Sequence, residues 1–391
     1  MPQSIAYLRE YRASKDAAMQ AVADSMGWTA DALRMAPLSW RDWPETSARV
    51  AEAMATAKKQ PRGGFGRWAK GLLLRLQYNG ARQYFLRHPG RVAVAWNGMT
   101  GTRRAFLAGA RDAGAVKLHV ELAPLPGRIT LDPAGVNFDN SVPRQPQFFH
   151  DWLAARPALD PAGWRALGTG MTARPSRRAD VGQGTGALPD SPFLFCPLQV
   201  PDDSQVLLYS GWCGGLDGFL AALAQGAAAL PEGWHIRLKE HPSAKVSLKD
   251  RLGPMLAGGR VVLDNDTDSF AQVAASRGVI TLNSSMGLQA FFFDKPVVTL
   301  GQAFFSVPGL VDHAKDQTEF DALMARPGDL GFDARLRDAF MTYLVAEYYP
   351  VFRHTDAGPD YDRAGFGAHV ARVAHRAGRP ISGAPIRKEK R

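Results

Sequence analysis

The sequence predicts an α/β protein built on parallel β-sheets, with two domains joined by a linker and an extra helical region at the amino terminus. Three observations lead to this fold class. A strand–helix–strand unit lies at 91–122, a longer alternation of short strands and helices runs from 193 to 300, and a stretch rich in Gly, Pro, Ser and Arg separates them. The 391 residues suffice for two or three domains. Two such domains joined by a linker are expected to form a cleft.

Helical spacing of Ala, Met and Leu predicts helices over 1–90, with turns near Pro37 and Pro44. Within this region, apolar residues from Phe65 to Leu76 alternate with Arg and Lys. Such a segment either covers a protein core or rests as a basic amphipathic helix on anionic lipid, and the first arrangement is the more common.

The spacing of apolar residues changes at Arg91 from a helical pattern to a short continuous run, which marks the start of the first predicted sheet. Strands are expected at 91–96 and 117–122 with a helix at 103–113 between them, and a β-α-β unit of this kind implies parallel strands. In the second series we expect strands at 193–200, 235–239, 261–263, 278–282 and 296–300, and helices at 216–230, 269–275 and 287–293. The predicted boundaries are 1–90, 91–175, a linker at 176–192, 193–335, and a carboxy-terminal helix and basic tail at 336–391.

Composition restricts the function classes. Hydrophobic residues make up 46% and charged residues 21%, which is typical of a globular protein and excludes global disorder. The net charge is +10, and 12 of the 47 basic residues are Lys, so the other 35 are Arg; this bias favours bidentate binding of phosphate or carboxylate groups. The two cysteines lack metal-ligand spacing, and we find neither a signal peptide nor a long apolar run, so we expect a cytoplasmic protein without disulfides or structural zinc.

The most specific stretch begins at Asn283, where a predicted strand ends. Ser284 and Ser285 offer hydroxyl groups at the start of a helix, and Gly287 permits close approach of a ligand. We therefore expect a phosphate group to bind here. The alternative is that Ser284 only caps the helix.

A second phosphate-directed pattern lies in residues 237–242, at the end of another predicted strand. Ligands bind outside the carboxyl ends of strands in open α/β sheets. We expect His241 to donate a hydrogen bond to a phosphate oxygen there, while Lys239 or Arg237 neutralises its charge.

Carboxylates follow other predicted strands. The block at 199–205 contains Asp202 and Asp203 and is either part of a site or a capped turn. Glu121 ends the strand at 117–122, where a carboxylate reaches either a cleft or the surface. The pair Asp264 and Asp266 is interpreted as a polar loop rather than a metal site.

Together these residues resemble the capsule polysaccharide biosynthesis family, which includes the β-Kdo glycosyltransferases of bacterial capsule assembly. The similarity runs in order from about 91 to about 310, and its most specific part is Asn-Ser-Ser-Met-Gly at 283–287 followed by Lys295-Pro296. The other matching positions are Glu121, Asp132, 135–137, 199–205, 239–242 and 301–305. Residues 1–90 and the carboxy-terminal end lie outside it.

The resemblance implies a GT-B architecture of two Rossmann-like domains facing a cleft, with 91–175 as the acceptor domain and 193–335 as the nucleotide-sugar domain. It also implies transfer of Kdo from CMP-Kdo to a glycolipid or polysaccharide acceptor, with retention at the anomeric carbon. His, Lys and a helix dipole can neutralise one phosphate, so neither a metal nor another cofactor is expected.

In a retaining reaction two carboxylates about 5 Å apart share the work. Asp203 is therefore the predicted nucleophile, with Asp202 as its competitor, and Glu121 the base that takes the acceptor proton. His241 is expected at the donor phosphate, and Arg128 or Arg144 at the Kdo carboxylate. The other predicted donor contacts are Gln199, Lys239, Asn283, Ser284, Ser285, Gly287 and Gln289, and the predicted substrate contacts are Asp132, Asn137, Arg144 and Ser204.

Gln289 departs from the family pattern, which often has Glu at this position, so a weaker contact to the nucleotide ribose is expected. The chain also matches one catalytic module, which predicts a single-linkage enzyme.

Two alternatives remain at this stage. One is a non-catalytic sugar- or nucleotide-binding partner in capsule assembly or export, and the other is nucleic-acid binding through the Arg-rich surface. No nucleic-acid motif supports the latter, so nucleic acid is not an expected partner. The basic charge is expected to attract the anionic donor, the acceptor and the inner-membrane surface, with export machinery as a further partner and the tail at 386–391 as a membrane contact.

Overall fold

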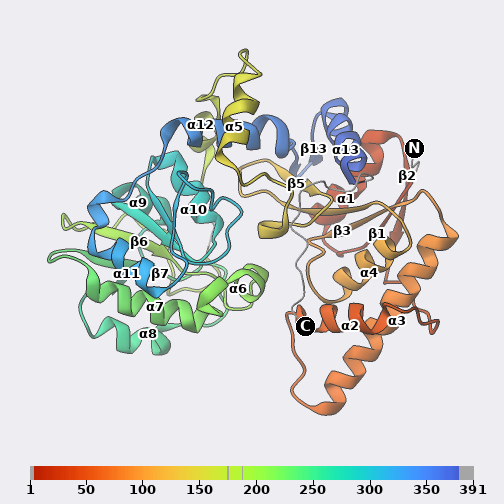
Figure 1. The fold of residues 1–391 in the computed structure, drawn as a ribbon, viewed down its shortest axis with the longest axis horizontal. Coiled ribbons are helices and arrows are strands. Elements are labelled where there is room, and N and C mark those ends of the chain that lie inside the picture. The colour runs from red at the N-terminus through yellow and green to blue at the C-terminus, as the bar shows by residue number, and fades with distance from the viewer. Residues whose placement is uncertain (1–3, 174–175, 187, 378–391) are drawn as a thin grey trace. The chain divides into compact units, whose positions relative to one another are not determined.

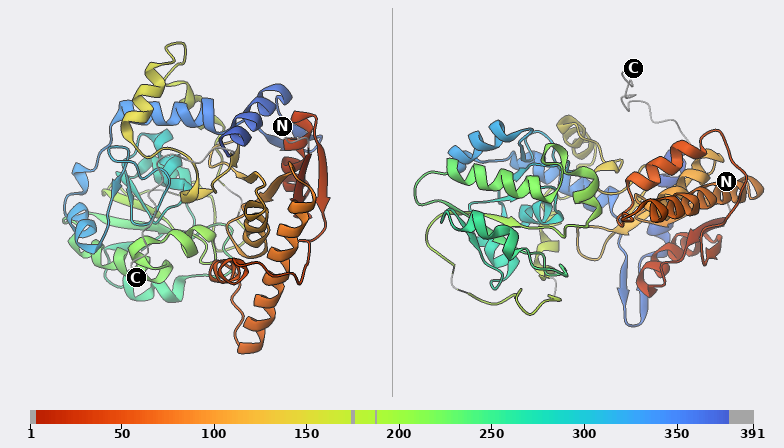
Figure 2. Two further views of the ribbon diagram at one scale, coloured as in Figure 1. Left: turned by 45° about the vertical axis from the view of Figure 1, so that its right-hand side comes forward. Right: turned by 90° about the horizontal axis from the view of Figure 1, so that it is seen from below.

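The computed structural model describes residues 4–173, 176–186 and 188–377, which fold into two compact units (Figures 1 and 2). Unit 1 comprises Met1–Ala123, Gly127–Ser141 and Tyr349–Arg391, and unit 2 comprises Pro124–Pro126 and Val142–Tyr348. The end of the chain therefore returns to the unit in which it began.

Unit 1 contains a five-stranded sheet in the order β2-β1-β3-β4-β5. The first four strands are parallel, and β5 runs antiparallel to β4. Their bounds are β1 Ser4–Leu8, β2 Thr29–Leu33, β3 Val92–Trp96, β4 Lys117–Leu122 and β5 Ile129–Asp132. β3 is buried along its whole length, as expected for a central strand covered on both faces. A separate hairpin pairs β12 (Arg353–Thr355) with β13 (Gly358–Asp360).

Helices cover both faces of this sheet. α1 (Ala13–Met26) and α13 (Arg363–Ala377) share one hydrophobic cluster with it, and α3 (Gly64–Arg87) and α4 (Gly101–Asp112) share another. In the second cluster the rings of Phe85 and Phe106 pack edge to face with centroids 5.5 Å apart. α2 (Thr46–Ala55) packs on α3 and α4, and a short 3-10 turn, η1, spans Asn137–Asp139.

Unit 2 contains a six-stranded parallel sheet in the order β11-β10-β9-β6-β7-β8. The bounds are β6 Phe193–Pro197, β7 His235–Lys239, β8 Val261–Leu263, β9 Gly278–Thr281, β10 Val297–Thr299 and β11 Asp312–His313. From β6 the chain adds β7 and β8 on one side, then crosses to add β9, β10 and β11 on the other. Ligands of open parallel sheets bind at such a reversal, outside the carboxyl ends of the strands. In this sheet the reversal lies between β6 and β9.

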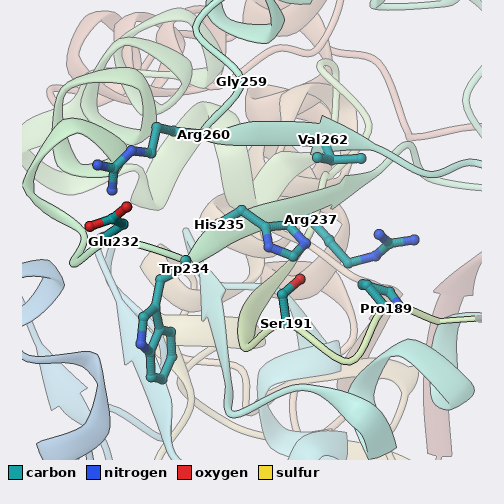
Figure 3. Close-up of a pocket in the computed structure, with 10 residues that line it drawn as sticks. Pro189, Ser191, Glu232, Trp234, His235, Arg237, Gly259, Arg260 and Val262 are labelled. Atoms are coloured by element: carbon teal, nitrogen blue, oxygen red, sulfur yellow. The ribbon is translucent and has the colours of Figure 1, made fainter.

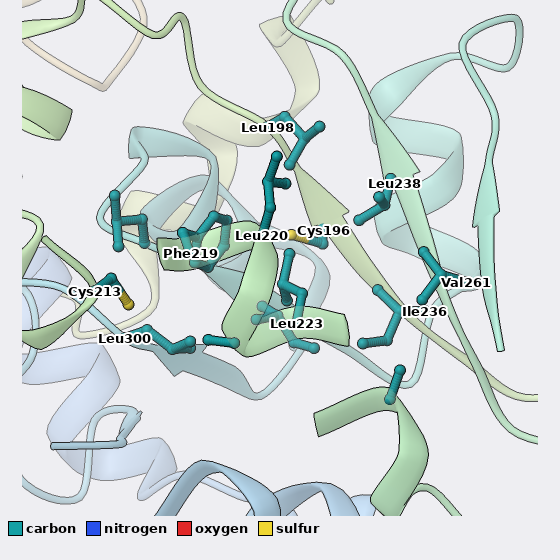
Figure 4. Close-up of a cluster of buried hydrophobic side chains, with 14 of the residues drawn as sticks. Cys196, Leu198, Cys213, Phe219, Leu220, Leu223, Ile236, Leu238, Val261 and Leu300 are labelled. Carbon is teal, nitrogen blue, oxygen red and sulfur yellow. The ribbon is translucent and has the colours of Figure 1, made fainter. Parts of the chain in front are cut away.

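α7 (Leu216–Ala229), α8 (Lys249–Leu256) and α11 (Gln317–Ala325) enclose the main core of unit 2, where aliphatic and aromatic side chains pack on the sheet (Figure 4). α9 (Ser269–Ala275) and α10 (Ser285–Gln289) lie on the other face (Figure 1). α5 (Pro146–Ala154) packs on α12 (Ala334–Tyr343), with the rings of Phe149 and Phe340 4.9 Å apart. The remaining elements are α6 Ser204–Tyr209, the 3-10 turns η2 Gly163–Gly170, η3 Gly211–Cys213, η4 Ala290–Phe293 and η5 Pro327–Asp329, and a π-helical turn, η6, at Leu344–Tyr348.

The predicted α/β class and most of the predicted elements are confirmed. The strands at 235–239 and 261–263 and the helix at 269–275 agree with β7, β8 and α9 at both ends. Cys196 and Cys213 are buried and unpaired with each other, as expected. Within the described ranges, no helix combines the length and the apolar character needed to cross a bilayer.

Two predicted boundaries are wrong. Residues 1–90 are not helical throughout, because β1 and β2 belong to the first sheet; both are short, and Ala-rich strands resemble helix in their pattern. Residues 176–192 do not link the units. Within this segment, the backbone N–H groups of Gly182 and Gly184 donate to the carbonyls of Asn265 (2.8 Å) and Asp266 (2.7 Å), which fixes it to unit 2.

The chain passes between the units at 141/142 instead, and its last part belongs to unit 1. Phe352 and Phe366 lie in the unit 1 core, whereas the predicted carboxy-terminal helix that begins at 336 is divided between α12 and η6 of unit 2 and the start of the returning segment. The tail at 386–391 lies outside the described residues.

Candidate functional site

Three neighbouring strands of unit 2 end at the same edge of the sheet, and predicted site residues follow each of them. Gln199 and Asp203 follow β6, His241 follows β7, and Ser284 follows β9. Adjacent strands are about 4.8 Å apart, so the ends of β7 and β9 are about 10 Å apart, within the span of one nucleotide. The structure therefore brings these residues to the edge where the strand order reverses.

Gln199 and Asn283 join the loops after β6 and β9. Gln199 Nε2 donates to Asn283 Oδ1 at 3.0 Å, and Asn283 Nδ2 donates to the carbonyls of Gln205 (3.0 Å) and Tyr209 (2.9 Å). Asn283 is 1% exposed, and both of its amide hydrogens are used within the protein. The Asn283 side chain therefore holds the two loops together, and its contact to the donor stays a prediction.

The start of α10 combines a capping role with exposed hydroxyl groups. Ser284 Oγ accepts a hydrogen bond from Met286 N–H at 3.2 Å, so Ser284 caps the helix. Ser284 and Ser285 are both partly exposed. Gly287 is buried, and a Cβ atom there would lie 3.0 Å from Phe305 Cζ. Its lack of a side chain thus serves internal packing.

Gln289 is occupied by a contact to the backbone. Its Nε2 donates to the carbonyl oxygen of Pro124 at 3.0 Å. A carboxylate at this position has no hydrogen to donate to a carbonyl. This contact gives a structural reason for Gln at a position where the family pattern has Glu.

Lys239 is buried at the end of β7 and serves the fold. Its Nζ donates to the carbonyl oxygens of Gly182 (2.7 Å), Asn265 (3.0 Å) and Thr267. An ammonium group has three hydrogens to donate, and all three are used. These bonds assign Lys239 to the fold, and its contact to the donor stays a prediction.

Glu240, the next residue, is also part of a buried network. Both Nη atoms of Arg178 donate to it (3.2 and 2.9 Å), as do Asn265 Nδ2 (2.8 Å) and the backbone N–H of Leu248. Burial by itself raises the pKa of Glu240, but these hydrogen bonds outweigh it, and the pKa lies below its ordinary value. The network fixes segment 176–184 against the sheet.

His241 is the partly exposed member of the Lys-Glu-His-Pro sequence. The backbone N–H of Ser243 donates to its Nδ1 at 3.0 Å. Because Nδ1 accepts this hydrogen bond, the neutral ring carries its proton on Nε2. The ring can therefore donate to an anion through Nε2–H.

Asp203 caps α6. Its Oδ1 accepts from Gln205 N–H at 2.9 Å, and Ser204 Oγ lies 3.5 Å from the same oxygen. Ser204 is buried, whereas Asp202 is exposed. The cap uses Oδ1 and holds the carboxylate of Asp203 at the carboxyl end of β6.

In unit 1, Glu121 lies at the carboxyl end of β4 and accepts a hydrogen bond from Asn97 Nδ2. Asn97 has a left-handed backbone (φ 59°) in the turn after β3, and His119 Nδ1 lies 2.8 Å from its carbonyl oxygen. Burial, with the charge of Lys117, lowers the pKa of His119 to about 3, so the ring is neutral. Lys117 Nζ lies 3.0 Å from His119 Nε2. This chain of contacts orients the Glu121 carboxylate.

Asp132, also in unit 1, is fully buried and organises its own loop. Its oxygens accept from the N–H groups of Ala134 (2.7 Å) and Gly135 (3.1 Å) and from Ser141 N–H (2.8 Å) and Oγ (2.7 Å). Burial and four internal hydrogen bonds thus assign the carboxylate to the loop, and the substrate contact through Asp132 stays a prediction. Asn137 is partly exposed, and its left-handed backbone (φ 56°) turns the same loop.

The two candidate partners of a sugar carboxylate belong to different units. Arg128, in unit 1, donates from Nη1 to the Tyr349 carbonyl at 2.6 Å, and Arg144, in unit 2, donates to the Val142 carbonyl. Burial and the nearby Arg353 lower the pKa of Arg128.

A shallow cavity of about 470 Å³ lies at the opposite, amino-terminal edge of the unit 2 sheet (Figure 3). Its cations are compensated: Arg237 pairs with Asp264 at 2.5 Å, and Arg260 donates to the Leu230 and Pro231 carbonyls. The Arg237 side chain thus pairs with Asp264, and its role at a phosphate stays a prediction. Asp264 Oδ1 also accepts from the N–H groups of Asp266 and Thr267, both at 3.0 Å, which confirms the interpretation of this stretch as a polar loop.

The sequence reasoning missed three residues that shape the site: Asn97, Arg178 and Asn265. The Asn97-Gly98 pair directly after a strand was a usable signal, because Asn and Gly tolerate left-handed backbone. Arg178 and Asn265 act through contacts far apart in the sequence, and no local pattern reveals them.

The fold and this strand-edge site define the chain as an α/β protein with the GT-B fold. Residues 177–349 match the family model described as "Capsule polysaccharide biosynthesis protein". The structure resembles that of Thermosulfurimonas dismutans KpsC, β Kdo 2,7 transferase, with a TM-score of 0.51 and 13% identity over 95% of this chain and 99% of that one.

Two sequence relatives extend the comparison. Protein FixF of Sinorhizobium fredii is 31% identical over 261 residues, which are 66% of this chain and 60% of FixF. The capsule polysaccharide modification protein LipB of Neisseria meningitidis serogroup A is 30% identical over 130 residues, 31% of this chain and 30% of LipB. The chain thus spans less than two thirds of these relatives. Residues 177–349 are thus similar to the capsule polysaccharide biosynthesis family over less than half of the chain.

Proposed function

We propose that this chain is a retaining glycosyltransferase that transfers Kdo from CMP-Kdo to a glycolipid or polysaccharide acceptor at the inner-membrane surface, where capsule is assembled and exported. The observation that carries the proposal is the strand edge between β6 and β9, where Asp203, His241 and Ser284 follow three adjacent strands within the family-matched segment. LipB is a capsule polysaccharide modification protein and KpsC a β Kdo transferase, and both names support the proposed substrate class.

The donor is held by hydroxyl and imidazole groups in this proposal. Ser284 Oγ accepts from Met286 N–H and keeps its own hydrogen, so it can donate to a phosphate oxygen while capping α10. His241 donates through Nε2–H to the same phosphate, and Ser285 adds a second hydroxyl. Gln199 lies beside them, positioned by Asn283. One phosphate held in this way leaves without a metal ion.

The chemistry is proposed as two displacements at the anomeric carbon of Kdo. Asp203 attacks this carbon through Oδ2 while its Oδ1 keeps the helix cap, and the bond to the phosphate oxygen breaks to release CMP. The acceptor hydroxyl then attacks the same carbon, its proton passes to Glu121, and the bond to Asp203 breaks. Arg144 is assigned to the Kdo carboxylate.

Calorimetric titration of the purified chain with CMP, CDP, UMP, UDP and GDP, with and without EDTA, tests the donor assignment. We expect selective CMP binding that EDTA does not change. His241→Gln and Ser284→Ala should weaken it about tenfold each, the value of one hydrogen bond to a charged group, whereas His354→Gln, at an exposed position, should not. Preference for a diphosphate, or no nucleotide binding, contradicts the assignment.

Transfer assays test the catalytic part. Asp203→Ala should abolish transfer from CMP-Kdo and keep CMP binding; full transfer by this variant excludes Asp203 as the nucleophile. CMP binding by the natural chain without transfer to any glycolipid or polysaccharide acceptor would instead favour a non-catalytic partner in capsule assembly.

A further inference from the structure

The amino-terminal half of α3 carries an apolar face that points away from unit 1. Phe65, Trp68 and Leu73 are 80%, 62% and 44% exposed, and the buried residues of this helix begin only at Leu74. Helical spacing places Phe65, Trp68, Leu72 and Leu76 along one side, opposite the buried Leu74 and Tyr78. Figures 1 and 2 show this end of α3 projecting beyond the rest of unit 1.

A neighbouring segment extends this face. The backbone N–H of Ser39 donates to the Leu76 carbonyl at 3.0 Å, and a Cβ on Gly80 would overlap with the Pro37 carbonyl. The segment therefore crosses α3 on the Leu76 side. We define the α3 face by its six exposed apolar residues: Met35, Leu38, Trp40, Phe65, Trp68 and Leu73.

Uncompensated positive charge surrounds the α3 face. Residues 53–111 contain twelve Lys and Arg and no Asp or Glu. Further along α3, Arg75 and Arg82 pair with Asp42 and Glu45. By contrast, the exposed side chains of Lys58, Lys59, Arg62 and Arg67, around the projecting end, form no salt bridge with any residue that the structure describes.

We propose that the α3 face docks on an anionic lipid bilayer. Trp and Phe side chains suit the boundary between headgroups and acyl chains, and Lys and Arg beside them contact lipid phosphates. This inference concerns unit 1 alone and stands independently of the proposed transfer reaction, although a membrane surface would place the chain beside a lipid-linked acceptor.

Charge and the apolar side chains disfavour three other partners for the α3 face, namely a second copy of the chain, its own carboxy-terminal tail and nucleic acid. A second copy would bring two basic faces together. Residues 378–391 carry five basic residues and one acidic residue, so they have the same sign of charge as the face. Nucleic acid would match the cations and the aromatic rings, but it offers no apolar phase for Met35, Leu38 and Leu73.

Flotation of the full chain with vesicles tests the proposal. We expect binding to phosphatidylcholine vesicles that contain phosphatidylglycerol and little binding to pure phosphatidylcholine. Raising the salt from about 0.1 M to about 1 M shortens the Debye length from about 10 Å to about 3 Å and should weaken binding. Arg62→Gln with Arg67→Gln should weaken it on the order of thirtyfold, and Phe65→Ser with Trp68→Ser about tenfold or more.

Matched control variants distinguish binding through the α3 face from binding through overall charge or through any exposed apolar side chain. Arg326→Gln with Arg335→Gln removes the same charge from exposed positions of unit 2, and Val246→Ser removes a 73% exposed apolar side chain there. Both should bind vesicles like the natural chain. The proposal is overturned if the control and test variants lose vesicle binding equally. It is also overturned if the chain binds only RNA or DNA, or if it self-associates through the α3 face independently of salt. CMP binding measured on the same variants reports separately on the proposed function.

Discussion

At the end of β7, burial assigns opposite roles to residues that are neighbours in the sequence. Lys239 and Glu240 have the charges that suit a ligand site, yet they are 2% and 1% exposed and hydrogen-bonded to segment 176–184 and to the loop after β8. His241, one residue further, is partly exposed. A charged side chain that satisfies all its hydrogen bonds internally stabilises the fold, whereas the partly exposed ring one position further along keeps a face toward solvent.

Lys239→Met should therefore reduce stability rather than affect ligand binding alone. The variant leaves the carbonyls of Gly182, Asn265 and Thr267 without their shared donor, and we expect a loss of about 3 kcal/mol in the free energy of unfolding. Urea unfolding measures it, with Lys245→Met at an exposed position as the control. Unchanged stability together with lost CMP binding would return Lys239 to the donor site.

Asn97 combines a backbone requirement with a side-chain contact, and two substitutions separate them. Asn97→Gly keeps the left-handed turn (φ 59°) and removes the hydrogen bond to Glu121, whereas Asn97→Ala also strains the backbone by about 1 kcal/mol. We expect both variants to lose transfer activity. Only Asn97→Ala should also have a lower free energy of unfolding, because of the backbone strain. Full activity in Asn97→Gly would show that Glu121 needs no help in orientation.

At the scale of elements, the Glu240 network links segment 176–184 to the sheet and makes stability depend on pH. The pKa of Glu240 is lower in the folded chain than in the unfolded one, so the folded state binds fewer protons. The stabilisation is present above the ordinary pKa of about 4.5 and is lost as the pH falls through the folded value. Glu240→Gln should be less stable at neutral pH and should lose less stability than the natural chain as the pH falls below about 4.5, measured by urea unfolding. An identical slope in both proteins would contradict this.

The sequence allowed prediction of the elements whose pattern is local. β7, β8 and α9 have clear apolar runs between turn residues, and their predicted bounds agree with the structure. β1 and β2 were missed because a five-residue strand such as Thr29-Ala-Asp-Ala-Leu33 has no distinct alternation. In the candidate site, too, only local patterns could be interpreted from the sequence, and these indicated the loops after β6, β7 and β9. The roles of Lys239, Asp132 and Asn283 depend on partners far away in the sequence, which no local pattern contains.

At the scale of the whole molecule, the two units divide the proposed reaction between them. The main core of unit 2 consists entirely of residues between Leu194 and Met324, and the predicted donor contacts lie in the same unit. Glu121 and its supporting residues Asn97 and His119 lie in unit 1. Donor binding is therefore expected to belong to unit 2, whereas the proposed proton acceptor, Glu121, belongs to unit 1.

A fragment of residues 142–348 tests this division. We expect it to unfold cooperatively and to bind CMP with the affinity of the full chain, because its core and its strand edge are complete; the lost contact between Gln289 and the Pro124 carbonyl costs about 1 kcal/mol. It should not transfer Kdo, because Glu121 is absent. Near-ultraviolet circular dichroism and calorimetry measure folding and binding. If the fragment folds but does not bind CMP, the donor site requires residues of unit 1, and the assignment of donor binding to unit 2 alone is wrong.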